Sequence, residues 1–535
     1  MREQVFWGWG EPGAGPELPA HAGEWLREAL GVPGGVVDAP VALEDVRLRD
    51  AALPEGLRAE LERIGVTVRD DRAARVLRCR GKSYLDLLAQ RAGDCEAAPD
   101  AVVRPVTHDQ VQDVLRACAE AGVAVVPFGG GTSVVGGLEA SRDGFDAVVS
   151  LDLGGMDRLV SVDERSLTAV LEPGVRLPEA DRALRAHGLT LAHVPQSYEW
   201  ATVGGCVATR SVGQSSTGHG RIDENVVSVR MAAPAGDVAT LSVPASAAGP
   251  ALRELVVGSE GALGVITRVA MQVRPLPEAR RFEGWVARSF AEGCELLRGL
   301  EQSGLAPDVA RLSDETETRI GIAMAGPGGF ARRAGMAASR ALGYGDGCLV
   351  VVGWEGDERA IAARRRPAAQ LLRRSGALPA GRGVGDGWAR TRFAGPHLRD
   401  DLLDRGVLVE TLETAATWTE LERVRADVAG ALRGALERPI VGCHVSHLYA
   451  TGASLYFTVL ARRDAGDPVG QWKRAKAAAG DAIAAAGATI THHHAVGRDH
   501  APWLEAEDGP LGVELLRALK DRCDPAGIMN PGVLI

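Results

Sequence analysis

The stretch "AGVAVVPFGGGTSVVGGLEA", residues 121–140, places five glycines within nine positions directly behind a short apolar run. The preceding residues predict an amphipathic helix, with apolar Val111, Val114, Leu115 and Cys118 on one face, and then a strand over 123–127. Together with the strand expected near residues 101–104, they predict a β-α-β unit that ends in a glycine loop.

A glycine loop at the end of a strand brings backbone N–H groups close to a phosphate, because no Cβ obstructs the approach. Thr132 and Ser133 add hydroxyl donors at the same place. The loop matches neither the dinucleotide pattern GxGxxG opening a helix nor a P-loop, since no GK[ST] follows. On its own it fits a tight structural turn as well as a phosphate site.

Two further stretches favour a ligand. They are "PQSYEWATVGGCVATRSVGQSSTGHG" at 195–220 and "GSEGALGVIT" at 258–267, and each supplies glycines beside small hydroxyl residues. A long cofactor with a pyrophosphate and a flat ring needs several such close approaches.

Length and composition limit the remaining choices. A chain of 535 residues, 46% of them hydrophobic, is expected to form two or three globular domains. A net charge of -10 disfavours nucleic acid as a partner. The eight scattered cysteines form no CxxC pair, and there is neither a signal peptide nor an apolar run of about 18 residues, so we expect a cytoplasmic protein.

Four regions are predicted along the chain. Residues 1–98 are expected to be loosely helical, and 99–276 to form an α+β domain around the glycine loop. Strands and helices alternate over 277–460, as in "DGCLVVVGWEG" and "SLYFTVLARR", which predicts a second α+β domain. An Ala-rich helix then leads into "ATITHHHAVG" within 461–535.

The motifs "PFGGGTSVVGG", "TVGGCVATRS" and "GSEGALGVIT" resemble the FAD-binding elements of the vanillyl-alcohol oxidase/p-cresol methylhydroxylase flavoprotein superfamily. Within it, the chain is similar to alkyldihydroxyacetonephosphate synthases from "WGWG" (7–10) to "HHHAVG" (492–497) and the terminal Asn. This resemblance implies an α+β fold with a two-subdomain FAD-binding domain of the p-cresol methylhydroxylase type and a cap domain with an antiparallel sheet. A C-terminal segment would return to the flavin.

The resemblance also implies the residues that hold FAD. The bond to FAD is expected to be non-covalent, because Cys206 fits better as a small packing residue than as a tether. The expected FAD-binding residues are Pro127, Gly129, Gly130, Gly131, Thr132, Ser133, Pro195, Ser197, Thr202, Gly204, Gly205, Thr209, Ser211, Glu260, Gly261, Gly264, Val265, Ile266 and Arg311.

Three consecutive histidines, 492–494, stand near the C-terminus. On a strand or turn their side chains alternate, so that His492 and His494 share one face while His493 points away. We expect no metal site, because adjacent histidines alone rarely complete a ligand shell and no carboxylate or Cys ligand accompanies them at a recognised spacing. The segment is similar to the active-site histidine segment of the synthases, which implies that His492, His493 and His494 are catalytic.

Two more catalytic residues follow from the resemblance. Tyr456 in "GASLYFTVL" matches the active-site tyrosine, and Arg399 in "GPHLRDDLLDRG" matches the arginine that grips the substrate phosphate. Glu410 and Glu413 could be structural helix charges and receive no role. The family's arginine after the cysteine of "GCHVSHLYATG" is replaced by His444.

The function implied is exchange of the acyl group of acyl-dihydroxyacetone phosphate for a long-chain alcohol through a flavin N5 adduct, in ether lipid synthesis. Tyr456 would orient or protonate a substrate oxygen, and His493 or His494 would move the proton on the reacting carbon. The resemblance also implies a homodimer, and a lipid-like substrate would allow peripheral contact with a membrane. The alternative is an FAD-linked oxidoreductase that oxidises a 2-hydroxy acid or related alcohol by hydride transfer to N5.

Overall fold

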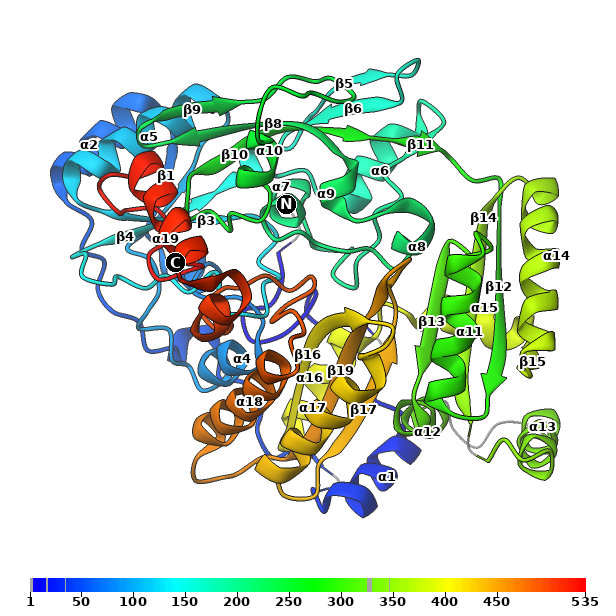
Figure 1. Cartoon of the computed structure of the whole chain (residues 1–535). Helices are drawn as coiled ribbons and strands as arrows, with labels where there is room; N and C mark the ends of the chain where they lie inside the picture. Colours follow the sequence, from blue (N-terminus) through cyan, green and yellow to red (C-terminus); the bar gives the residue numbers. More distant parts are fainter. Residues whose placement is uncertain (1–2, 16–17, 34, 325–329, 346) are drawn as a thin grey trace.

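A computed structural model describes residues 3–15, 18–33, 35–324, 330–345 and 347–535. The first half of the chain builds sheets of four and five strands, and the second half builds one large sheet (Figure 1). Each of these three sheets has its own apolar core. Strands β7 (Leu189–Thr190) and β11 (Arg274–Pro275) form a further sheet of two strands.

The first sheet contains the predicted β-α-β unit. Helix α5 (His108–Ala121) begins at Thr107, whose side chain accepts a hydrogen bond from the Gln110 N–H, and ends at Gly122 with φ +64°. The sheet order is β1-β2-β4-β3, in which β4 pairs in parallel with both β2 and β3. The strands are β1 (Thr67–Arg69), β2 (Ala101–Arg104), β3 (Ala124–Phe128) and β4 (Val148–Asp152).

The N-terminal region is less purely helical than predicted. Strand β1 pairs antiparallel with β2, and α2 (Glu55–Ile64) packs on α5. Leu57 and Leu61 of α2 are buried in the core of the first sheet. The helical character of residues 1–98 was predicted, whereas a strand of three residues carries too short a pattern to be recognised.

The second sheet is antiparallel, with the order β5-β6-β10-β8-β9. Helix α7 (Val203–Ala208), which lies within the second glycine stretch, packs against β10. The strands are β5 (Leu159–Asp163), β6 (Thr168–Leu171), β8 (Val226–Ala233), β9 (Gly236–Ala239) and β10 (Val265–Gln272).

The large sheet has eight strands, all antiparallel, in the order β15-β12-β14-β13-β17-β19-β16, with β18 paired to β19. Its strands are β12 (Ala279–Ala287), β13 (Val309–Ser313), β14 (Cys348–Gly356), β15 (Leu378–Gly381), β16 (Val407–Thr417), β17 (Ile440–Val445), β18 (Leu448–Tyr449) and β19 (Gly452–Arg462). Helix α17 (Leu421–Ala435) packs against β16, β17 and β19, and the Ala-rich α18 (Pro468–Ala485) packs against α17 and β16 (Figure 1).

Both ends of the chain return to the glycine loop. After α19 (Leu504–Cys523), the Val125 N–H of β3 donates to the Ile528 carbonyl at 2.8 Å. The Asn530 side chain then donates to the carbonyls of Gly137 and Glu260, at 3.1 and 2.7 Å. At the other end, the Gln4 side chain donates to the Gly130 carbonyl at 2.9 Å. Among the described residues, no helix combines the length and apolar character that a membrane span requires.

Candidate active site

The three glycine stretches meet in space. A Cβ on Gly130 would lie 2.2 Å from the Trp200 carbonyl oxygen, and one on Gly129 would lie 2.5 Å from the Thr202 hydroxyl. Gly261, with φ +77°, lies against the Pro127 ring, where a Cβ would come within 2.9 Å of Cγ. A Cβ would therefore clash with the backbone at Gly130, and with a neighbouring side chain at Gly129 and Gly261.

A cavity of about 360 Å³ opens beside the glycine loop. Its wall includes Gly129, Gly130, Gly131 and Thr202, together with four basic side chains, among them Lys82, and four acidic ones. Glycine backbone and basic groups in one cavity suit the pyrophosphate of a dinucleotide. The residues present therefore fit FAD at this place.

Other expected FAD-binding residues shape the same region through hydrogen bonds within the protein. Thr202 caps α7 by accepting from the Gly205 N–H, Gly204 donates to the Pro173 carbonyl, and Ser211 contacts His193. The remaining expected residues lie in the three stretches or beside them: Thr132, Ser133, Pro195, Ser197, Thr209, Gly264, Val265 and Ile266.

Glu260 binds the backbone of the segment that follows the three histidines. Its half-buried carboxylate accepts from the N–H groups of Val496 and Gly497, both at 2.8 Å. Burial raises the pKa of Glu260 to about 7. The third glycine stretch therefore joins the glycine loop to the C-terminal histidines.

The large sheet aligns three functional candidates in one row. Tyr456 on β19 pairs across the ladder with Glu413 on β16 and with His444 on β17. Directly paired residues project from the same face of a sheet, so the three side chains lie together. The rings of His444 and Tyr456 stack at 4.7 Å. Glu410 and Glu413 are thus buried strand residues, and the interpretation as helix charges was wrong.

Glu413 organises the histidine segment. Its carboxylate accepts from the backbone N–H groups of His492, His493 and His494 and from the Thr491 hydroxyl, the last at 2.6 Å. Three consecutive N–H groups can converge on one carboxylate only if the chain curls around it, as in an anion-binding nest.

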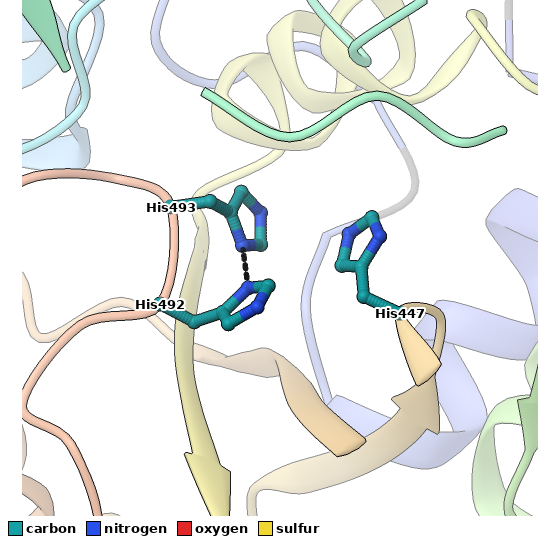
Figure 2. Close-up of side chains that lie close together, drawn as sticks. All are labelled: His447, His492 and His493. Atoms are coloured by element: carbon teal, nitrogen blue, oxygen red, sulfur yellow. Dashed lines mark hydrogen bonds between the residues drawn. The ribbon is translucent and has the colours of Figure 1, made fainter. Parts of the chain in front are cut away.

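This curl overturns the expected alternation of the histidines. His492 and His493 face each other, with their Nδ1 atoms 3.0 Å apart (Figure 2), whereas His493 was expected to point away from its neighbours. The Tyr456 ring stacks on His493 at 5.8 Å and meets the edge of His494 at 5.5 Å. The structure therefore brings Tyr456 and all three predicted histidines into one cluster.

A fourth histidine, His447, joins this cluster and was missed in the sequence. It follows β17 in the short turn before β18, and its ring lies opposite His492 and His493 in Figure 2. The argument against a metal considered only neighbours along the chain, whereas the fold adds both His447 and Glu413. The position of His447 in the sequence did not predict its place beside Tyr449 and Tyr456. That place depends on the pairing of β17 and β18 with β19.

The electrostatics of the cluster set its protonation. Burial lowers the pKa of His492 and His494 to about 3, and it also lowers that of His493. Burial acts to raise the pKa of Glu413, but the three histidines and Thr491 hold it well below its usual value. Burial raises the pKa of Tyr456 to about 12. At neutral pH the cluster thus combines neutral imidazoles, an ionised carboxylate and a protonated phenol.

The two predicted arginines lie on different sides of the site. Arg311 contacts Glu317 and the His444 ring, which places it beside Tyr456. Arg399 on α16 (Gly395–Asp404) donates to the Lys82 carbonyl at 2.6 Å, so it lies toward the glycine loop and not in the histidine cluster.

Comparison with known proteins agrees with this geometry. Residues 99–242 match the family model "FAD binding domain", and residues 276–534 match "FAD linked oxidases, C-terminal domain". The alkyldihydroxyacetonephosphate synthase of Dictyostelium discoideum is 31% identical over 480 residues, which cover 88% of this chain and 78% of the relative. The synthase of Trypanosoma brucei brucei is 31% identical over 482 residues with the same coverage.

A solved structure of an alkyldihydroxyacetonephosphate synthase superposes with a TM-score of 0.85 at 26% identity, over 99% of this chain and 98% of the other. Fold and site together define an FAD-dependent enzyme with the two-domain architecture of the FAD-linked oxidases, and FAD is its cofactor. Within that class, the chain belongs to the alkyldihydroxyacetonephosphate synthase family.

Proposed function

We propose that this enzyme exchanges the acyl group of acyl-dihydroxyacetone phosphate for a long-chain alcohol, forming an ether lipid precursor without net oxidation. Similarity to synthases along most of the chain supports the reaction. The single observation that carries it is the buried cluster in which the Tyr456 phenol adjoins the imidazoles of His493 and His494. When bound, the flavin supplies the group that displaces the acyl chain from the substrate carbon.

The protein's own part is proton handling. A neutral imidazole accepts a proton, so His493 or His494 moves the proton on the reacting carbon. Tyr456 keeps its proton at neutral pH, because burial raises its pKa to about 12, and it donates a hydrogen bond to a substrate oxygen. Glu413, ionised at the base of the cluster, offsets the positive charge that appears when an imidazole is protonated.

Arg399 is the proposed ligand of the substrate phosphate. One guanidinium nitrogen is engaged with the Lys82 carbonyl. Its Nε is buried and has no hydrogen-bond partner among the described residues. A buried donor without a partner destabilises the protein. A phosphate oxygen that accepts from it would be bound by both ionic attraction and a hydrogen bond.

We further propose a cytoplasmic homodimer that touches membranes peripherally while it takes up its lipid substrate. Leu511 and Leu515, one helical turn apart on α19, are 67% and 63% exposed and offer an apolar contact. Light scattering tests the dimer, and flotation with phospholipid vesicles tests the membrane contact. A monomer, or a protein that stays with the aqueous fraction, would contradict these two points.

The Tyr456→Phe variant tests the reaction. With acyl-dihydroxyacetone phosphate and a radiolabelled long-chain alcohol, we expect labelled ether product from the FAD-loaded protein and at least about 100-fold less from the variant. Tyr344→Phe is the matched control, because Tyr344 is a buried tyrosine whose hydroxyl bonds the Gly376 carbonyl, in a contact that involves none of the cluster residues. Equal product from both variants would contradict the role of Tyr456, and absence of product from the parent protein would contradict the reaction.

A further inference from the structure

His447, His492 and His493 bring three ring nitrogens close together. One nitrogen from each ring lies within 4.8 Å of the other two. Figure 2 shows that His492 and His493 come from one loop, while His447 reaches them from the turn after β17. Two segments that are 45 residues apart in sequence thus form one cluster of three imidazoles.

The outward nitrogens of two of these rings already have partners. Nδ1 of His447 lies 2.7 Å from the Ser216 hydroxyl, and Nε2 of His492 lies 2.6 Å from the Tyr449 hydroxyl. Metal-binding histidines characteristically anchor the second ring nitrogen in this way, which fixes the ring and its tautomer. The arrangement leaves Nε2 of His447 and Nδ1 of His492 for the centre of the cluster.

The spacing is close to that of a coordination shell. With metal–nitrogen bonds of about 2.0–2.1 Å, two imidazole nitrogens on a tetrahedral ion are about 3.3 Å apart. Nδ1 of His492 and Nδ1 of His493 are 3.0 Å apart. His447 has to approach by at most about 1.5 Å, since its nitrogen lies within 4.8 Å of the other two.

Charge and access also suit a cation. The Glu413 carboxylate lies 3.6 Å from Nδ1 of His493, and its side chain is fully buried. It would offset one of the two charges of a divalent ion from outside the ligand shell. His447 and His492 are buried, whereas His493 is only partly buried, so the cluster is more open on the His493 side.

We propose that His447, His492 and His493 bind one divalent transition-metal ion of the zinc type, with a fourth coordination position open to an oxygen ligand. Three imidazoles with one open position form the ligand set of catalytic zinc. Mg²⁺ and Ca²⁺ are disfavoured, because they require oxygen ligands. The proposal concerns metal binding and goes beyond the exchange reaction; an ion bound to His493 would leave His494 as the imidazole that accepts the proton.

The test uses the full-length, FAD-loaded protein after treatment with a chelator. Equilibrium dialysis against Zn²⁺, with metal analysis, is expected to give one ion per chain, and X-ray absorption at the zinc edge is expected to show three imidazole ligands. His447→Ala is expected to weaken binding at least about 100-fold, and Ser216→Ala about 10-fold. His447→Gln, which keeps a polar group for Ser216, is the second variant in case the alanine variant fails to fold.

His187→Ala is the matched control, because His187 is a 38% exposed histidine on the surface, paired with Glu164. It should bind Zn²⁺ as the parent protein does. The proposal is overturned if the parent binds no zinc, or if the His447 variants bind it as tightly as His187→Ala does.

Discussion

Replacing Glu413 by Gln should release the histidine loop from the large sheet. In the parent protein, one carboxylate oxygen accepts from Thr491, His493 and His494, and the other accepts from the His492 N–H. A glutamine keeps the shape but replaces one oxygen by an NH₂ group. At least one buried N–H of the loop then loses its acceptor and faces another donor.

The size of the effect follows from these contacts. An unsatisfied buried N–H costs about 1–3 kcal/mol, and each of the three remaining bonds loses about 1 kcal/mol when its acceptor loses its charge. Relief of the cost of burying the carboxylate offsets part of this sum. We expect a net local loss of about 2 kcal/mol, which corresponds to an opening equilibrium constant of the loop about 30-fold larger.

Hydrogen–deuterium exchange measured by mass spectrometry on peptides covering 489–497, in the presence of a chelator, reads this opening directly. Glu410→Gln is the matched control, because Glu410 is a buried glutamate on the same strand that accepts from the N–H groups of Tyr84 and Thr411 and does not contact the loop. Exchange over 489–497 should rise in Glu413→Gln only. Unchanged exchange in that variant would refute the assigned role of Glu413.

Three further outcomes are expected. Gly130→Ala should lower FAD content at least about tenfold, measured as flavin absorbance per protein, because its Cβ would lie 2.2 Å from the Trp200 carbonyl oxygen. Gly434→Ala, in α17 with no described neighbour within 4 Å, is the control and should keep its FAD. Equal FAD content in the two variants would contradict the packing argument. Burial lowers the pKa of Lys82 to about 7, so between about pH 7 and 10 the unfolded state binds more protons than the folded state and stability rises with pH. From pH 7.5 to 9.5, the free energy of unfolding in urea should increase by about 2–3 kcal/mol more in the parent protein than in Lys82→Met. The same change in both proteins would contradict this. Burial raises the pKa of the Cys206 thiol to about 12, which leaves it protonated; denaturation should therefore release all FAD into the filtrate, and flavin that stays with the protein would contradict non-covalent binding.

The strongly periodic parts of the fold were predictable from the sequence. Helix α5 shows its buried face in Val111, Val114, Leu115 and Cys118, and the glycine loop follows β3 at the expected residues. Both features follow from short-range sequence patterns: apolar residues at helical spacing, then a short apolar run typical of a strand, then consecutive glycines.

The histidine site was only partly predictable, because long-range pairing decides it. Glu413 accepts hydrogen bonds from residues 492–494, which follow it by 79–81 positions, and no local sequence pattern predicts that contact. The same holds for His447: the pairing of β17, β18 and β16 with β19 places it near Glu413, which holds the loop of His492. The alternation rule failed for residues 492–494 because a single carboxylate collects three successive N–H groups.

The most direct test of the proposed exchange is an anaerobic absorbance scan of the FAD-loaded protein, mixed in turn with acyl-dihydroxyacetone phosphate and with 2-hydroxy acids. We predict that only the acyl ketone phosphate bleaches the visible flavin band, and that a long-chain alcohol restores it without oxygen. Bleaching by a 2-hydroxy acid that persists until oxygen is admitted would show net oxidation and contradict the proposed function.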